Sequence, residues 1–304
     1  MHSFQLHPGS PSVGWETMFR PTDGSHMILV TGATGVIGRR VVEQLVAGGA
    51  AVRATSRTPD TAGLPDAVEV VRPTDPAAAL LHGCSALLIV ASALGTDQEE
   101  RLSELVDAAN ATGTGRLVHL STASVTDSQS PTGAHHRALE EVSSRFDDTR
   151  HVLRPVPFAL NTLHWWGPTV RAARFAEAPY LDVPMTPVDE RDVADVAAAL
   201  LLGTPEPDGP LHLTGPNALS SREQLAVIAE ALGTPLDVRP IEPDEVRRRL
   251  AAVGVPAPAV DAMLRSFEVA AEHPSRPTDA VSRILGRPAR SYASWACDHI
   301  EGFR

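Results

Sequence analysis

The chain has 304 residues, of which 43% are hydrophobic, and a formal net charge of −11 at pH 7. A chain of this size can bury about three quarters of its unfolded surface, enough for one large or two modest domains. The acidic balance argues against a nucleic-acid partner, and no apolar run has the length of a membrane span. With only two cysteines, Cys84 and Cys297, we expect a protein of the reducing cytoplasm with neither a disulfide framework nor a bound metal.

Residues 1–26 contain scattered Pro, Gly and Ser and lack both the basic start and the apolar core of a signal peptide. The sequence Gly24-Ser25-His26 before Met27 resembles the remnant of a cleaved purification tag. We therefore expect residues 1–26 to be a disordered extension or a cloning remnant, and the fold to begin at Met27.

From Met27 onward the sequence alternates short apolar segments with helical stretches, the pattern of a parallel sheet covered by helices on both faces. Strands are expected at 27–31, 51–55, 68–71, 86–90, 116–120 and 151–153. Helices are expected at 36–45, 97–111 and 133–145. These elements predict an α/β fold with a doubly wound parallel sheet, in which ligands bind at the carboxyl ends of the strands.

The first strand runs into a turn with glycines at positions 32, 35 and 38, just before a helix. Gly32 permits a tight turn, Gly35 lets the backbone approach a pyrophosphate, and Gly38 lets the helix pack closely on the strand. The sequence therefore predicts a dinucleotide site at this turn. Its expected contacts are Gly32, Thr34, Gly35, Val36, Ile37 and Gly38.

The second strand indicates which dinucleotide the site takes. An NAD-binding protein usually has Asp or Glu after this strand to hold the ribose hydroxyls. Here Ser56 and Arg57 stand instead, where a 2′-phosphate would lie, so NADP(H) is the expected cofactor. The alternative is that Arg53 and Arg57 are ordinary solvated arginines.

Small and hydroxyl residues follow the fourth and fifth strands, namely Ala91, Ser92, Ser121 and Thr122. Small side chains would let the nicotinamide ring lie flat against the backbone. Ser121 would place a hydroxyl near the reacting carbon of the ring, and we treat it as a candidate catalytic residue. Such residues also end strands for purely structural reasons, so both interpretations stay open.

Every residue counted as Lys or Arg in this chain is an arginine. The chain therefore lacks the Tyr-x-x-x-Lys pair with which most short-chain dehydrogenases protonate a substrate oxygen. The helix expected at 133–145 offers instead His136 and Glu140, four residues apart on one face. His136 is the candidate acid, oriented or charged by Glu140. The alternative is a surface pair worth only about 0.2–0.5 kcal/mol.

After Arg154 many prolines interrupt the alternation and aromatic residues become frequent. We expect 27–154 to be the NADP-binding core, and 155–304 to be a smaller, helix-rich substrate-side region packed on it as one unit. Arg154 is expected to tie the two parts together through an ion pair with Asp189 or Asp192. The candidate substrate contacts are Thr122, Phe158, Asn161, Trp165 and Trp166, although the tryptophans could equally be core.

Several segments in order along the chain, Thr31–Gly38, Leu117–Ser124, Leu153–Pro155, Val188–Ala194 and Leu213–Pro216, resemble the NmrA-like atypical short-chain dehydrogenase/reductases. The resemblance implies an NAD(P)-binding Rossmann domain with a small variable C-terminal region. That family includes NADPH-dependent quinone, dye and benzylic-ether reductases, and also regulators that bind the cofactor without turning it over. It therefore specifies the fold better than the activity.

The missing Tyr and Lys restrict the substrate. Reduction of an aliphatic ketone yields an alkoxide whose conjugate acid has a pKa of about 15.7, whereas a quinone yields a phenolate-like oxygen with a pKa of about 10, a difference worth roughly 8 kcal/mol. We therefore expect an NADPH-dependent reductase of a conjugated molecule, quinone-like, enone-like or aromatic. The alternatives are an NADP-binding redox-sensing regulator with a partner protein, or a non-redox cyclase or epimerase of secondary metabolism on the same fold. The sequence leaves the exact substrate and the oligomeric state open.

Overall fold

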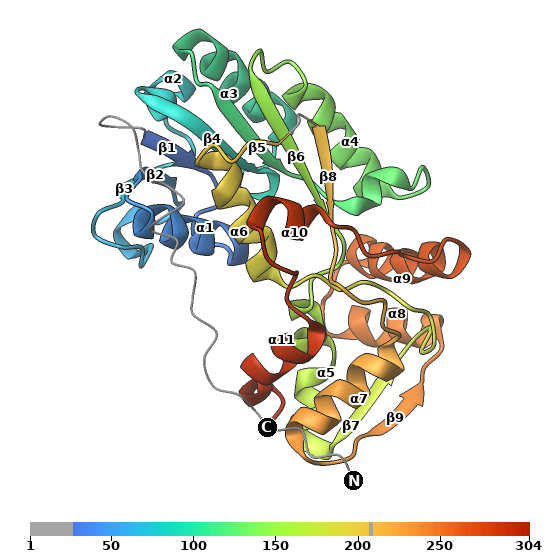
Figure 1. Ribbon diagram of the computed structural model, residues 1–304. Coiled ribbons are helices and arrows are strands. Elements are labelled where there is room, and N and C mark those ends of the chain that lie inside the picture. Colours follow the sequence, from blue (N-terminus) through green and yellow to red (C-terminus); the bar gives the residue numbers. More distant parts are fainter. Residues whose placement is uncertain (1–26, 207–208) are drawn as a thin grey trace.

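The computed structural model describes residues 27–206 and 209–304, so the extension expected at 1–26 lies outside the described residues. Seven strands form one parallel sheet in the order β3-β2-β1-β4-β5-β6-β8 (Figure 1). The strands are β1 Met27–Val30, β2 Ala51–Thr55, β3 Glu69–Val71, β4 Cys84–Val90, β5 Arg116–Leu120, β6 Thr149–Pro155 and β8 Gly209–Leu213. This sheet confirms the predicted α/β fold.

Helices cover both faces of the sheet, as expected for a doubly wound fold (Figure 1). One face packs against α1 Val36–Ala47, α6 Glu190–Leu201 and α10 Ala280–Leu285. The other packs against α2 Ala77–Leu81, α3 Gln98–Thr112 and α4 Pro131–Ser143. Alternate residues of a strand face opposite sides, and in β1 Ile28 and Val30 join the first core whereas Leu29 joins the second. Helices therefore shield both faces of the sheet from water, which explains why the strands consist largely of apolar residues.

The strand order reverses between β1 and β4. The chain goes from β1 outward to β3 on one side and from β4 outward to β8 on the other. In such sheets a crevice opens beyond the carboxyl ends of the strands at this reversal, and ligands bind there. The glycine turn follows β1 and Ser92 follows β4, so both lie at this crevice.

The remaining elements form a helix-rich part beyond the carboxyl ends of the strands (Figure 1). They are α5 Leu160–Ala173, β7 Phe175–Ala178, α7 Ser221–Leu232, β9 Asp237–Pro240, α8 Pro243–Ala252, α9 Ala257–Glu272 and α11 Tyr292–Asp298. The strands β7 and β9 pair in parallel, and Ser220 and Glu223 form a capping box at the start of α7. None of the helices in 27–206 and 209–304 combines the length and apolar character needed to cross a membrane.

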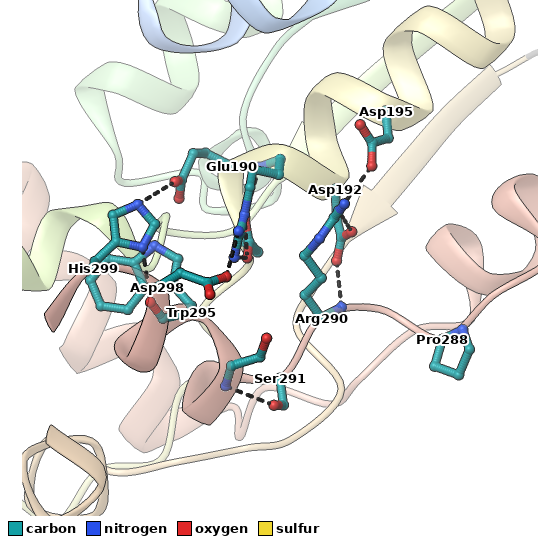
Figure 2. Close-up of polar contacts among 12 residues, drawn as sticks. Glu190, Asp192, Asp195, Pro288, Arg290, Ser291, Trp295, Asp298 and His299 are labelled. Carbon is teal, nitrogen blue, oxygen red and sulfur yellow. Dashed lines mark hydrogen bonds and ion pairs between the residues drawn. The ribbon is translucent and has the colours of Figure 1, made fainter. Parts of the chain in front are cut away.

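Buried carboxylates on α6 hold the end of the chain against the sheet layer (Figure 2). The Arg290 Nη1 lies 2.5 Å from Asp192 Oδ1 and 2.9 Å from Asp195 Oδ2, and Arg287 contacts the same two carboxylates. The ion pair that was expected between Arg154 and Asp192 is therefore wrong. Asp192 pairs with arginines of the last segment because that segment returns along α6.

Candidate functional site

The three glycines of the turn differ in role, because the fold needs Gly32 and Gly38 whereas Gly35 faces outward. A Cβ at Gly38 would lie 2.1 Å from the Gly32 carbonyl oxygen, so only glycine fits where α1 packs on the turn. Gly32 has a φ of +65°, in the left-handed region that favours glycine. A Cβ at Gly35 would meet only that same carbonyl oxygen, at 3.3 Å, and Gly35 is exposed at the start of α1. The open space at Gly35 is the space that a pyrophosphate needs.

The other residues of the turn fit the same ligand. Thr34 and Val36 are exposed beside the positive N-terminus of α1, where backbone N–H groups attract an anion. Val36 is 49% exposed at this helix start. Ile37 is buried in the core, so its side chain supports the turn from below rather than facing the ligand.

The end of β2 presents the candidate site for the 2′-phosphate. Ser56 is buried and its Oγ accepts a hydrogen bond from the Thr58 N–H at 3.1 Å, while Arg57 is exposed. Arg72, after β3, reaches over to donate to the Arg57 carbonyl oxygen at 3.4 Å. Arg53 is different, because its side chain is only 11% exposed and pairs with Glu69 at 2.9 Å. Arg72 was missed in the sequence, although an arginine directly after the third strand is the signal that places it beside Arg57.

A cavity of about 810 Å³ lies over the carboxyl ends of β4, β5, β6 and β8, between α5 and α9. Its size is within the range of small-molecule sites. Eight of the residues predicted from separate parts of the sequence meet on its wall, whereas those of the glycine turn and of the end of β2 do not line it. The eight are Ala91, Ser92, Ser121, Thr122, His136, Phe158, Asn161 and Trp165.

Trp166 does not line this cavity, although it was expected beside Trp165 on the substrate wall. It is only 3% exposed, and its indole N–H donates to the Glu177 carbonyl oxygen at 3.1 Å. Consecutive residues of a helix point about 100° apart, so α5 turns Trp165 toward the cavity and Trp166 into the core. Trp165 packs on Phe267 of α9, with ring centroids 6.2 Å apart.

Ser121 is held by a carboxylate that an arginine neutralises. The Ser121 hydroxyl donates to Glu140 Oε1 at 2.5 Å, and Arg154 donates from Nε to the same oxygen at 3.0 Å and from Nη2 to Oε2 at 2.5 Å. Burial alone would raise the pKa of Glu140, but the hydrogen bonds from Arg154 and Ser121 outweigh burial and hold this pKa below its ordinary value. The hydroxyl proton of Ser121 is thereby held by a carboxylate that is ionised near pH 7.

His136 lines the cavity without the partner that was expected for it. Glu140 contacts Ser121 and Arg154 instead, and it affects His136 only through its charge. Burial, together with the nearby His135, lowers the pKa of His136, against the opposing effect of Glu140. Its Nδ1 is buried without a hydrogen-bond partner in the described part of the chain. A histidine in this setting is neutral near pH 7 and is a weak proton donor.

The cavity also contains polar residues that the sequence did not single out. His212 and Thr214 come from the end of β8, and burial with the charge of Arg154 lowers the pKa of His212. On the opposite wall, Arg265 of α9 pairs with Asp127 at 2.9 Å. His212 and Thr214 lie at the carboxyl end of a strand of the parallel sheet, and this position is the signal that could have found them. The Arg265–Asp127 pair joins distant parts of the chain, and no sequence pattern indicated it.

The pattern of the NAD(P)H-binding family matches residues 32–203, from the glycine turn to the end of α6. The chain belongs to this family. The match confirms the NAD(P)H cofactor and the family resemblance read from the sequence. The matched residues include the glycine turn, the end of β2 and the ends of β4 and β5.

Named relatives span almost the whole chain. A (4-alkanoyl-5-oxo-2,5-dihydrofuran-3-yl)methyl phosphate reductase from Streptomyces griseus is 36% identical over 287 residues, which cover 91% of this chain and 99% of the relative. An NAD(P)H azoreductase from Xenophilus azovorans is 28% identical, with 91% and 99% covered. The structure of an NADPH-dependent quinone oxidoreductase from Escherichia coli in complex with NADPH superposes with a TM-score of 0.77 at 20% identity, covering 90% and 99%. This last likeness confirms the fold.

Proposed function

We propose that this protein is an NADPH-dependent reductase of conjugated acceptors, in which a carbon–carbon double bond or a quinone is reduced next to a carbonyl group. The observation that carries this proposal is that the polar groups which the structure describes around Ser121 include no strong proton donor. Ser121 gives its proton to ionised Glu140, and the pKa of His136 is lowered. No tyrosine or lysine is available at this wall. The cavity therefore suits a substrate that stabilises its own negative charge.

The residues at the wall have specific roles in this proposal. When bound, NADPH supplies the hydride, which goes to the carbon β to the carbonyl as the double bond opens. Negative charge then moves to the carbonyl oxygen, and water delivers a proton to the α carbon. Asn161 lines the cavity, and its amide has no side-chain hydrogen bond to the described residues, so its N–H can donate to that oxygen. Phe158 and Trp165 form an apolar wall for a planar substrate.

The Streptomyces griseus relative supports this class of substrate. Its name describes a reductase of a five-membered lactone carrying an alkanoyl group. In that molecule the ring double bond is conjugated with both the lactone and the alkanoyl carbonyl, so two oxygens share the charge after hydride arrives. An azo group, named for the Xenophilus azovorans relative, is likewise a conjugated acceptor.

The surface gives little support to the alternative of a regulator that docks on a partner through an apolar patch. Among the described residues, the large hydrophobic side chains that are exposed are Val36, at the cofactor turn, and Val253, on the far helix-rich part. These are isolated positions rather than a patch. A cavity of about 810 Å³ next to the cofactor crevice favours an enzyme.

The test is NADPH consumption with matched acceptors. Menadione, 2-cyclohexenone and the free alcohol of a 4-alkanoyl butenolide represent conjugated acceptors, and cyclohexanone represents an ordinary ketone. If only half of the roughly 8 kcal/mol difference in product acidity is expressed, kcat/KM for the quinone should exceed that for cyclohexanone by about 10³. Equal rates for cyclohexanone and the conjugated acceptors would mean that the site holds an effective acid after all.

A further inference from the structure

One wall of the cavity carries a positive charge that the chain itself does not neutralise. Two arginines and one aspartate line the cavity, and Arg265 is paired with that aspartate, Asp127, at 2.9 Å. Arg276 makes no side-chain hydrogen bond or ion pair with residues 27–206 and 209–304.

The backbone around Arg276 is held in place. Pro274 and Pro277 flank the segment and limit its backbone freedom. Ser275 Oγ lies 2.7 Å from Thr186 Oγ1. The Thr278 hydroxyl donates to the His212 carbonyl oxygen at 2.6 Å. The backbone is thus fixed on both sides of Arg276, whose exposed side chain lines the cavity.

The phosphates of the cofactor are not the anions that Arg276 would bind. Its loop is anchored to Thr214, at the end of β8, through the Thr278 N–H at 2.8 Å. In the sheet, β8 is separated from β1 by β4, β5 and β6, which places β8 roughly 19 Å from the glycine turn at about 4.8 Å per strand. A pyrophosphate at the start of α1 is therefore out of reach of Arg276.

We propose that Arg276 receives an anionic oxygen group, a phosphate monoester or a carboxylate, carried by the substrate. This inference rests on the proposed reductase function, since it names the substrate class of the same cavity. A guanidinium fork binds either group through two parallel hydrogen bonds. His273 lines the cavity next to it and adds a further polar contact. The proposal assigns Arg276 to substrate affinity and not to the hydride step.

The experiment compares three ligands built on one scaffold, the butenolide alcohol used above, its phosphate monoester and its hemisuccinate. Each is titrated by calorimetry into the complex of the protein with NADP+, in which no turnover occurs. At least one anionic ligand should bind about tenfold to a hundredfold more tightly than the alcohol, as expected for charge-assisted hydrogen bonds. Whichever anionic ligand binds more tightly shows whether the site prefers a phosphate or a carboxylate.

Variants test whether Arg276 is responsible. In Arg276→Ala and Arg276→Gln the anionic ligand should bind no better than the alcohol, while NADP+ binding stays unchanged. Arg248→Ala is the matched control, because it removes an exposed arginine that lies outside the cavity wall and changes the net charge equally. It should retain the preference for the anion.

The proposal is overturned if the three ligands bind equally to the unaltered protein, if none binds, or if Arg276→Gln weakens the alcohol as much as the anions. These outcomes are independent of turnover. A protein that binds the anionic ligand through Arg276 but reduces none of the conjugated acceptors would keep this inference and overturn the proposed reductase function.

Discussion

Replacing Glu140 by glutamine tests the network that holds Ser121. The substitution keeps the shape of the side chain but removes the charge that accepts hydrogen bonds from Ser121 at 2.5 Å and from Arg154 at 2.5 and 3.0 Å. The side chains of Arg154 and Glu140 are only 20% and 11% exposed, so Arg154 would be left largely buried without a counter-charge. Breaking such a pair costs up to about 3–5 kcal/mol when it is fully buried, and we expect roughly 2–3 kcal/mol here because solvent screens part of it.

Thermal unfolding measures this loss, which should lower the melting temperature by roughly 3–5 °C for a chain of this length. Glu141→Gln is the control, since Glu141 is the exposed neighbour on the same helix and should change the melting temperature by little. The pKa of Glu140 is lowered in the folded protein, so its stabilisation is present above the ordinary pKa of 4.5 and is lost as the pH falls through the lowered value. The difference between the variant and the unaltered protein should therefore shrink in acid. Equal melting temperatures for Glu140→Gln and Glu141→Gln at pH 7 would refute the network.

Gly35→Ala should stay folded and lose NADPH binding in a calorimetric titration, whereas Gly38→Ala should lower the melting temperature, because its Cβ would meet the Gly32 carbonyl oxygen at 2.1 Å. Arg57→Ala should weaken NADPH roughly tenfold to a hundredfold and leave NADH unchanged; equal losses would remove Arg57 from the 2′-phosphate site. His119 is buried and its pKa falls from 6.5 to about 4, so the unfolded chain takes up the proton first and stability drops by roughly 3 kcal/mol as the pH falls from 6.5 to 4. In urea titrations, His119→Gln should make the free energy of unfolding depend less steeply on pH. An unchanged pH dependence would mean that other groups cause it. Asn161→Leu should lower kcat on menadione by about 10²–10³ with little change in NADPH affinity.

Features encoded by local sequence were predictable. The glycine turn, the strand at Ala51–Thr55 and the strand at Arg116–Leu120 agree with the structure because their signals lie within a few residues of each other. The predicted sheet edge also brought Ser92, Ser121 and His136 to one cavity, since parallel strands end on the same side. The helix α5 was missed because Pro168 lies inside it and was taken as a sign of irregular chain.

Contacts between distant segments were not predictable from one sequence. Glu140 was assigned to His136, four residues away, but the fold brings Arg154 from the next strand to it. In the same way, Asp192 pairs with arginines almost a hundred residues further along the chain. Charged residues can satisfy several alternative partners, and only the tertiary arrangement selects one. Hydrophobic periodicity specifies which face of a helix is buried, not which charge it meets.

The most direct test of the proposed function follows the hydride itself. NADPH carrying deuterium at the transferable position is incubated with the protein and the butenolide alcohol, and the product is examined by NMR. Reduction of the conjugated double bond predicts deuterium on the ring carbon that bears the hydroxymethyl group, with both carbonyl groups retained. Deuterium on the former alkanoyl carbonyl carbon would show that this protein reduces ketones and would contradict a site built without a strong acid.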